Sequence, residues 1–301
     1  MKCLRFSLAF FIGLVFTPSL PAQTKPAATP PVASAKHSLW RVEGKTNAVY
    51  FFGSIHFLKQ EFYPLDAPIE DAFKKCAAVM FETDLSAAED LSAQLKILQM
   101  AKYPDGQTLA DNLSPATYKL FQKKVKELVG IENMFDQFKP WMASMTLLIF
   151  ELQRLGFNPQ SGLDKHFYDE AKSGGKKITW FETPEFQIKL LDDFSKEDQE
   201  KFLKSTLDDL DKFEKVFADI IAAWKTGDTK KIDSLISDDV RKYPTLYKKL
   251  LTDRNESWLP KIEEILKSGP DTFIVVGAAH LVGKDGVVEM LAKKGYKIQQ
   301  L

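Results

Sequence analysis

The chain has 301 residues, of which 45% are hydrophobic and 27% charged, with 41 basic and 41 acidic side chains. This composition is typical of a globular protein and excludes a disordered or fibrous chain. Balanced charge without a basic patch gives no indication of a nucleic-acid partner. A chain of this length can bury one large core or two modest ones.

The first 22 residues have the pattern of a secretory signal peptide. Lys2 and Arg5 precede an apolar stretch, and Leu20-Pro21-Ala22 fits a cleavage site. A transmembrane anchor needs about 20 apolar residues, more than this run offers, and Cys3 lies before the apolar stretch, where a lipoprotein cysteine would follow it. A buried N-terminal helix is the remaining alternative. We expect cleavage after residue 22 and a secreted or periplasmic protein without a stable membrane anchor.

The mature chain then divides into a flexible linker at 23–37 and a single domain at 38–301. The linker is rich in Pro and Ala, which gives it nothing to pack, and His37 is expected to be idle. Cys76 is the cysteine that remains after processing, so no internal disulfide is expected. We expect it to be a small buried residue rather than a nucleophile.

Short apolar runs near both ends of the mature chain predict β-strands. The first two runs are separated by Gly44-Lys45-Thr46-Asn47 and predict a hairpin. The predicted strands cover 39–43, 48–52, 79–83, 177–181, 272–276 and 296–299. Because these runs are far apart in sequence but must share a sheet, we expect 48–52 and 272–276 to lie together in its core.

The middle of the chain, about 85–267, has helical periodicity that only 177–181 interrupts. Behind a capping-box-like Ser195-Lys196-Glu197-Asp198, apolar residues recur at three- and four-residue steps, which predicts one long amphipathic helix over 196–225. Further predicted helices cover 91–100, 115–129, 141–155, 163–171 and 259–266. The sequence therefore predicts an α+β fold, a central mixed sheet built from both ends of the mature chain with a large helical cap.

Two histidines follow predicted strands by the same spacer. Gly53-Ser54-Ile55-His56 closes strand 48–52, and Gly277-Ala278-Ala279-His280 closes strand 272–276. Ligands and catalytic groups gather at strand ends, and glycine permits close approach of other groups there. The matched spacing indicates a shared site rather than two unrelated core histidines.

Carboxylates end two further strands in the same tripeptide, Phe81-Glu82-Thr83 and Phe181-Glu182-Thr183. A glutamate on an apolar strand needs a cation, a hydrogen-bond donor or a metal as its partner. Two imidazoles and a carboxylate are a common ligand set for zinc, manganese or iron. The sequence therefore indicates metal binding by His56, Glu82 and His280, although each residue taken singly also fits a core or capping role.

Other candidate residues give weaker signals. Asp253-Arg254-Asn255 could bring a guanidinium and an amide to the site for charge stabilisation, or could form an N-cap with a solvated arginine. His166 is expected on a helix surface. The common signatures of zinc peptidases, serine hydrolases and nucleotide-binding proteins are missing from the sequence.

These motifs resemble those of the TraB/PrgY/GumN family, which includes the Tiki proteins of animals. That family has two Gly-Xaa-Xaa-His motifs, matched at 53–56 and 277–280, a strand-end glutamate, matched by Glu82, and an Arg-Asn pair, matched by Arg254-Asn255. The likeness spans about 38–299. Bacterial members are further similar in Gly162-Leu163-Asp164, in Phe181-Glu182-Thr183 followed by Gln187, and in the residues after His280.

The resemblance implies a fold similar to the erythromycin-esterase and ChaN group. Tiki members are metal-dependent proteases, and plasmid-encoded members dampen peptide pheromone signals by cleavage or sequestration. It therefore implies a secreted hydrolase of peptides or small molecules, with Mn, Co or Zn on His56, Glu82 and His280. Glu182 would carry a proton, and Arg254 or Asn255 would steady the oxyanion or a substrate terminus. A protein that sequesters a ligand without turnover and a helical scaffold protein are the alternatives.

Overall fold

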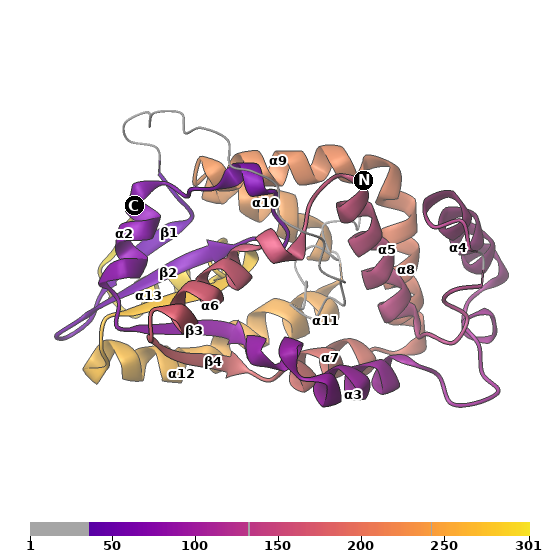
Figure 1. The fold of residues 1–301 in the computed structure, drawn as a ribbon, viewed down its shortest axis with the longest axis horizontal. Coiled ribbons are helices and arrows are strands. Elements are labelled where there is room, and N and C mark those ends of the chain that lie inside the picture. The colour runs from indigo at the N-terminus through magenta and orange to yellow at the C-terminus, as the bar shows by residue number, and fades with distance from the viewer. Residues whose placement is uncertain (1–35, 132, 242) are drawn as a thin grey trace.

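The computed structural model describes residues 36–301 apart from 132 and 242. It holds a six-stranded mixed sheet (Figure 1) in the order β4-β3-β5-β2-β1-β6. The strands are β1 Leu39–Glu43, β2 Ala48–Ser54, β3 Ala78–Thr83, β4 Lys177–Glu182, β5 Thr272–Gly277 and β6 Ile298–Gln300. The predicted α+β class and the central mixed sheet are confirmed. The predicted signal peptide lies outside the described residues.

The four strands β2, β5, β3 and β4 are parallel neighbours, and β1 is antiparallel to β2 and β6. The expected pairing of the first and last parts of the chain is confirmed, because β2 and β5 are adjacent with Ser54 opposite Gly277. The carboxyl ends of the four parallel strands therefore meet at one edge of the sheet. Ligand sites in parallel sheets form at this edge.

Helices surround the sheet on both faces and extend beyond its carboxyl edge (Figure 1). In Figure 1, α2 and α6 lie on one face, α12 and α13 on the other, and α4, α5 and α8 extend past the strand ends. The helices are α2 Ala67–Lys75, α3 Leu91–Ala101, α4 Pro115–Leu128, α5 Pro140–Arg154, α6 Leu163–Ser173, α7 Pro184–Asp192, α8 Lys196–Asp209, α9 Phe213–Lys225, α10 Thr229–Val240, α11 Pro244–Tyr247, α12 Asp253–Ser268 and α13 Val287–Lys293. None of the described helices is long and apolar enough to cross a membrane.

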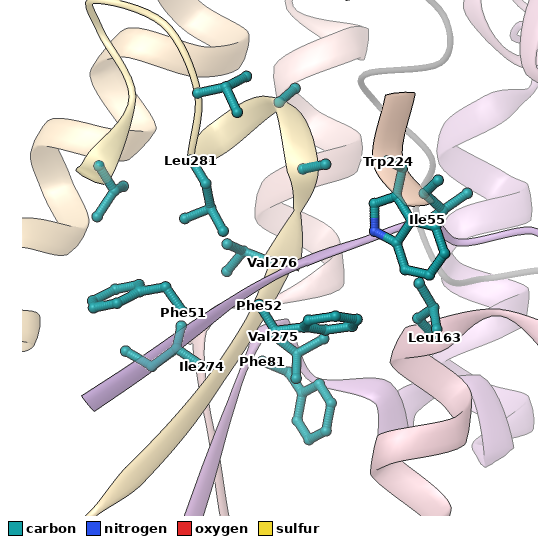
Figure 2. Packing of buried hydrophobic residues seen from close by; sticks show 14 of the residues in the cluster. Phe51, Phe52, Ile55, Phe81, Leu163, Trp224, Ile274, Val275, Val276 and Leu281 are labelled. Carbon is teal, nitrogen blue, oxygen red and sulfur yellow. The ribbon is translucent and has the colours of Figure 1, made fainter. Parts of the chain in front are cut away.

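The inner strands are buried on both faces. Every residue of β2, β3 and β5 is buried, as expected for parallel strands covered by helices on each side. Phe51 and Phe52 leave β2 on opposite sides (Figure 2). The Phe52 ring lies 5.3 Å from that of Phe167 on α6 and 6.3 Å from that of Trp224 on α9. This packing anchors the strand that leads into His56.

The predicted long helix over 196–225 is wrong in one respect, because it divides into two helices. The 3₁₀ turn Leu210–Lys212 separates α8 from α9, and the two helices run in different directions (Figure 1). Leu203 and Leu207 of α8 pack in a second core with α4 and α5, whereas Phe217 of α9 packs in the main core. Both apolar faces are covered, so these side chains do not supply the exposed stripe that a scaffold role requires.

Two smaller predictions concern single residues. Cys76 is buried, as predicted, and burial raises the pKa of its thiol to about 12. His37 is not idle: it is 8% exposed, and its Nε2 lies 3.1 Å from Oδ2 of Asp66. Its backbone N–H donates to the carbonyl of Leu301, so the folded part of the chain begins within the segment predicted as linker.

Candidate active site

A buried arginine lies at the centre of the polar cluster at the carboxyl edge. Arg254 is 2% exposed. Its Nη2 donates to Oε1 of Glu82 at 2.5 Å and to Oε2 of Glu182 at 2.7 Å, and its Nε donates to Oε1 of Glu182 at 2.9 Å. The two strand-end carboxylates thus share one guanidinium. The predicted N-cap with a solvated arginine is wrong, since Arg254 lies in the first turn of α12 and points into the protein.

The electrostatics of this cluster keep both partners charged. Burial by itself would raise the pKa of Glu82, but the charge of Arg254 and the two nearby histidines outweigh it, so this pKa lies well below its usual range. Burial would lower the pKa of Arg254, but Glu82 and Glu182 raise it above its usual value. The cluster is therefore a salt-bridged unit at neutral pH.

His280 is held as a neutral imidazole in one tautomer. Its side chain is fully buried, with Nε2 3.0 Å from Nη1 of Arg254 and Nδ1 2.6 Å from Oδ1 of Asn255. A guanidinium can only donate, so Nε2 accepts and Nδ1 carries the proton that it donates to Asn255. Burial and the charge of Arg254 lower the pKa of His280 to about 3.

His56 has a different partner from His280, and its pKa is shifted in the opposite direction. Its Nδ1 lies 2.6 Å from Oδ2 of Asp164, which also accepts from Ser54 Oγ at 2.9 Å. Burial lowers the pKa of His56, but the charge and hydrogen bond of Asp164 raise it more, so the net pKa is above the ordinary value. Nδ1 is committed to Asp164, which leaves Nε2 for the site.

The start of α6 brings Asp164 to His56. The N–H of Leu163 donates to the carbonyl of Ile55, and a Cβ on Gly162 would lie 2.1 Å from the carbonyl oxygen of His56. Glycine at 162 is therefore required for this close approach. The Gly162-Leu163-Asp164 motif, which had no predicted role, therefore positions His56.

Further donors hold the two glutamates in place. Gln187 of α7 donates from Nε2 to Glu82 Oε1 and Glu182 Oε2, both at 3.0 Å. Trp258 Nε1 donates to Glu182 Oε1 at 2.8 Å, and the N–H of Gly277 donates to Glu82 Oε2 at 3.0 Å. Both oxygens of Glu182 are thus engaged by fixed donors, an arrangement that suits holding Arg254. Its role as a proton carrier stays a prediction.

The three predicted ligands come together around Gly277. A methyl group placed on this glycine would lie 3.5 Å from Glu82 Oε2, 3.7 Å from His56 Nε2 and 3.7 Å from His280 Cδ2. These side chains come from three different strand ends, and the order of the parallel strands brings them to one point. Arg254 and Asn255 contact the same group, so the structure also gathers the predicted Arg-Asn pair here.

The orientation of the two histidine rings fits a divalent metal site. Each histidine directs its Nδ1 to a carboxylate or amide oxygen, which is how metal-bound histidines are usually oriented, with the other nitrogen facing the metal. His280 Nε2 lies 3.9 Å from Glu82 Oε1. Nη1 of Arg254 contacts His280 Nε2, and Nη2 of Arg254 contacts Glu82 Oε1. A metal bound to His280 would therefore take the position of the Nη1–H group of Arg254.

A second group of candidate ligands lies between α2 and α6. Among the described residues, Glu70, His166 and Glu170 bring three ligand atoms within 4.8 Å of one another, closer than the three residues around Gly277. His166 Nε2 lies 3.7 Å from Glu70 Oε1 and 3.9 Å from Glu170 Oε1. As predicted, His166 lies on a helix, but Tyr63 covers its ring at 4.7 Å.

These features define a class of protein, in which two Gly-Xaa-Xaa-His segments, a strand-end glutamate and a helix-borne arginine meet at the carboxyl edge of a mixed sheet. The chain belongs to the TraB/PrgY/gumN family, whose sequence profile matches residues 38–300. It is similar to the uncharacterized protein YbaP of Escherichia coli (strain K12), with 24% identity over 243 residues, covering 80% of this chain and 87% of YbaP. YbaP of Shigella flexneri matches with the same identity and coverage. No solved structure matches the chain.

Proposed function

We propose that the protein is a metal-dependent hydrolase of peptides or other small carbonyl substrates, with its reaction centre beside Gly277. The observation that supports this is the convergence of His56 Nε2, Glu82 Oε2 and the His280 ring around the position that a Cβ on Gly277 would take. A buried cluster of fixed donors and charges, with strongly perturbed pKa values, is the usual setting of catalysis.

Asp164 orients His56 toward the proposed reaction centre. It accepts the hydrogen bond that Nδ1 donates and so leaves Nε2 as the nitrogen that would bind a metal ion. Asp164 also raises the pKa of His56 above its ordinary value, so proton uptake by Nε2 would compete with metal binding. His56 would therefore hold the ion as a neutral imidazole, and binding should weaken as the pH falls.

His56, Glu82 and His280 would hold a divalent ion such as Mn, Co or Zn. When bound, such an ion lowers the pKa of water and polarises a carbonyl oxygen. Arg254 would release His280 and direct Nη1 at the oxygen of the substrate that gains negative charge, while Glu182 keeps Nε and Nη2 in place. Asn255 would keep the tautomer of His280 fixed.

Metal binding is tested on purified protein after chelator treatment, by titration with Mn, Co or Zn and measurement of bound metal per chain. We expect one ion that is lost in His56→Ala and in His280→Ala but retained in His166→Ala. Loss in His166→Ala alone would assign the ion to Glu70, His166 and Glu170 and would contradict its proposed role beside Gly277.

Turnover is tested by digestion of a peptide library with and without metal, followed by mass spectrometry. Cleavage that depends on metal and disappears in His56→Ala supports the hydrolase. The second candidate function is sequestration without cleavage, which one observation favours: Arg254 already provides partners for Glu82 and His280 without a metal. Peptide binding that survives chelation, with no cleavage products, would support sequestration.

We also propose that the chain is exported and processed. The basic start, apolar stretch and Leu20-Pro21-Ala22 support cleavage after residue 22. N-terminal sequencing of the protein recovered outside the cytoplasm should begin at Gln23. Recovery of the intact N-terminus from the cytoplasm would contradict export.

A further inference from the structure

A small apolar cavity adjoins His56 and Gly277 on the side of α9 and α10. Its volume is about 40 Å³. The site contributes Ser54–Phe57 and Gly277–Ala279 to its wall, and the opposite wall consists of Leu152, Phe217, Ile220, Trp224, Ile232 and Ile236. Trp224 and Ile55 mark this region in Figure 2. The cavity therefore shares two wall residues with the proposed reaction centre.

Two polar side chains in this wall are already engaged. The indole N–H of Trp224 donates to the carbonyl of Gly53 at 2.7 Å, and Ser54 Oγ donates to Asp164. A space of this volume has room for about three water molecules, but water needs two to four polar partners to be held in a cavity. An aliphatic group is the better occupant, because it removes apolar surface from water on both sides.

We infer that the cavity receives a small aliphatic side chain of the substrate, on the residue next to the bond that is cleaved. The inference rests on the proposed function and adds a substrate class to it: peptides with Val, Ile or Leu beside the scissile bond. His56 lies at the boundary between the cavity and the reaction centre, so a side chain seated in the cavity would hold its own carbonyl near Nε2.

The size and polarity of the cavity determine which side chains it takes. A charged side chain would lose its hydration without gaining a partner, and an aromatic ring needs more space than a branched aliphatic group. A single methylene in such a pocket changes the specificity constant by about 10- to 200-fold. We therefore expect at least a tenfold preference for Val, Ile or Leu over Gly, Asp or Phe at this position.

The test uses the peptide library with metal-loaded protein and two cavity variants. Ile220→Ala enlarges the cavity and should extend cleavage to Phe and Met by at least tenfold, and Ile220→Val should shift the preference in the same direction by less. Leu147→Ala, a buried truncation in the second core, is the matched control and should leave the preference unchanged. Circular dichroism confirms that each variant is folded.

The outcomes separate this inference from the proposed function. Cleavage by wild type without a preference for aliphatic residues, or a preference that both Ile220 variants leave unchanged, overturns the inference and leaves the hydrolase standing. If wild type cleaves nothing, the library is captured on immobilised protein instead. Retention of aliphatic peptides that broadens to Phe in Ile220→Ala supports the cavity as a binding site, and retention without this dependence overturns it.

Discussion

Nη1 of Arg254 lies 3.0 Å from Nε2 of His280, and both side chains are buried. A charged guanidinium therefore donates to a neutral imidazole inside the protein, and the same arginine forms ion pairs with both Glu82 and Glu182. These three contacts hold together the residues of the proposed reaction centre. A change in any one of them alters the charge balance at the end of the sheet.

Replacement of Arg254 by Met should strongly destabilise the protein. It leaves two buried carboxylates without their cation, and the loss of one partner from a buried ion pair costs about 3–5 kcal/mol. Urea unfolding followed by circular dichroism measures the loss. Arg41→Met is the matched control, because Arg41 pairs with Glu43 in an exposed ion pair, and should cost far less. Equal losses in the two variants would contradict the buried network.

Acid should destabilise the fold through His280. Its folded-state pKa of about 3 lies below the ordinary value of 6.5, so between pH 6.5 and pH 3 the unfolded chain binds a proton that the folded chain does not. Stability therefore falls as pH falls through this window, by up to about 1.4 kcal/mol per pH unit from this residue. His56 adds no slope well below pH 6.5, because its raised pKa keeps it protonated in both states.

The contribution of His280 is isolated by comparison with His280→Gln. Unfolding free energies of both proteins are measured between pH 4 and pH 7.5 in the presence of a chelator. The difference between wild type and variant should shrink steadily as pH falls below 6.5. A difference that is independent of pH would show that His280 takes up a proton in the folded state.

Gly277→Ala should abolish function without loss of stability. The added methyl group makes ordinary contacts of 3.5 to 3.7 Å and fills the space between Glu82 Oε2 and His56 Nε2. An alanine at an unstrained position stabilises by about 0.4–1 kcal/mol. Metal titration and library digestion should both fail in this variant although it unfolds like wild type.

Gly53→Ala is the comparison for Gly277→Ala. Its Cβ would lie 3.1 Å from the Cα and Cβ of Ala278, closer than most Cβ contacts, so that Ala278 would have to shift by a few tenths of an ångström. We expect this variant to lose stability. Full metal binding by a stably folded Gly277→Ala protein would place the reaction centre elsewhere.

Asp164→Asn should lower the pKa of His56. The amide removes the negative charge that raises this pKa but keeps a similar shape and an acceptor for Ser54. Nuclear magnetic resonance titration of histidine ring carbons, assigned with His56→Ala, follows the change. The rise of hydrolytic activity with pH should move to lower pH by the same amount. An unchanged His56 titration would contradict control by Asp164.

Local sequence signals predicted most of the sheet. Apolar runs bounded by turn residues predicted β1 and β5 to within one residue, whereas β6 begins two residues and ends one residue later than predicted. The shared Gly-Xaa-Xaa-His spacing correctly brought His56 and His280 to one edge. These predictions succeeded because strand burial and strand ends leave a pattern within a few neighbouring residues.

Pairings between distant residues were not predicted. The need of Glu82 for a partner was clear from its apolar strand, and Arg254 was a candidate for the site. Nothing in the sequence paired the two, because Arg254 lies on α12, far along the chain. Periodicity likewise predicted a continuous helix through Leu210–Lys212. The spacing of apolar residues shows that a helix has a buried face, but it does not show that the two halves are buried in different cores. Asp164 had a local motif but no signal that linked it to His56.

The position of β5 has a consequence for how the chain folds. This strand lies between β2 and β3 in the sheet but is made after the entire helical middle. Until Thr272–Gly277 has been synthesised, β2 and β3 have no common neighbour, and their exposed edges can pair with other chains. A nascent or C-terminally clipped chain that lacks β5 therefore has an open sheet and neither Gly277 nor His280. Assembly of the sheet and completion of the group around Gly277 become the same late event in biosynthesis.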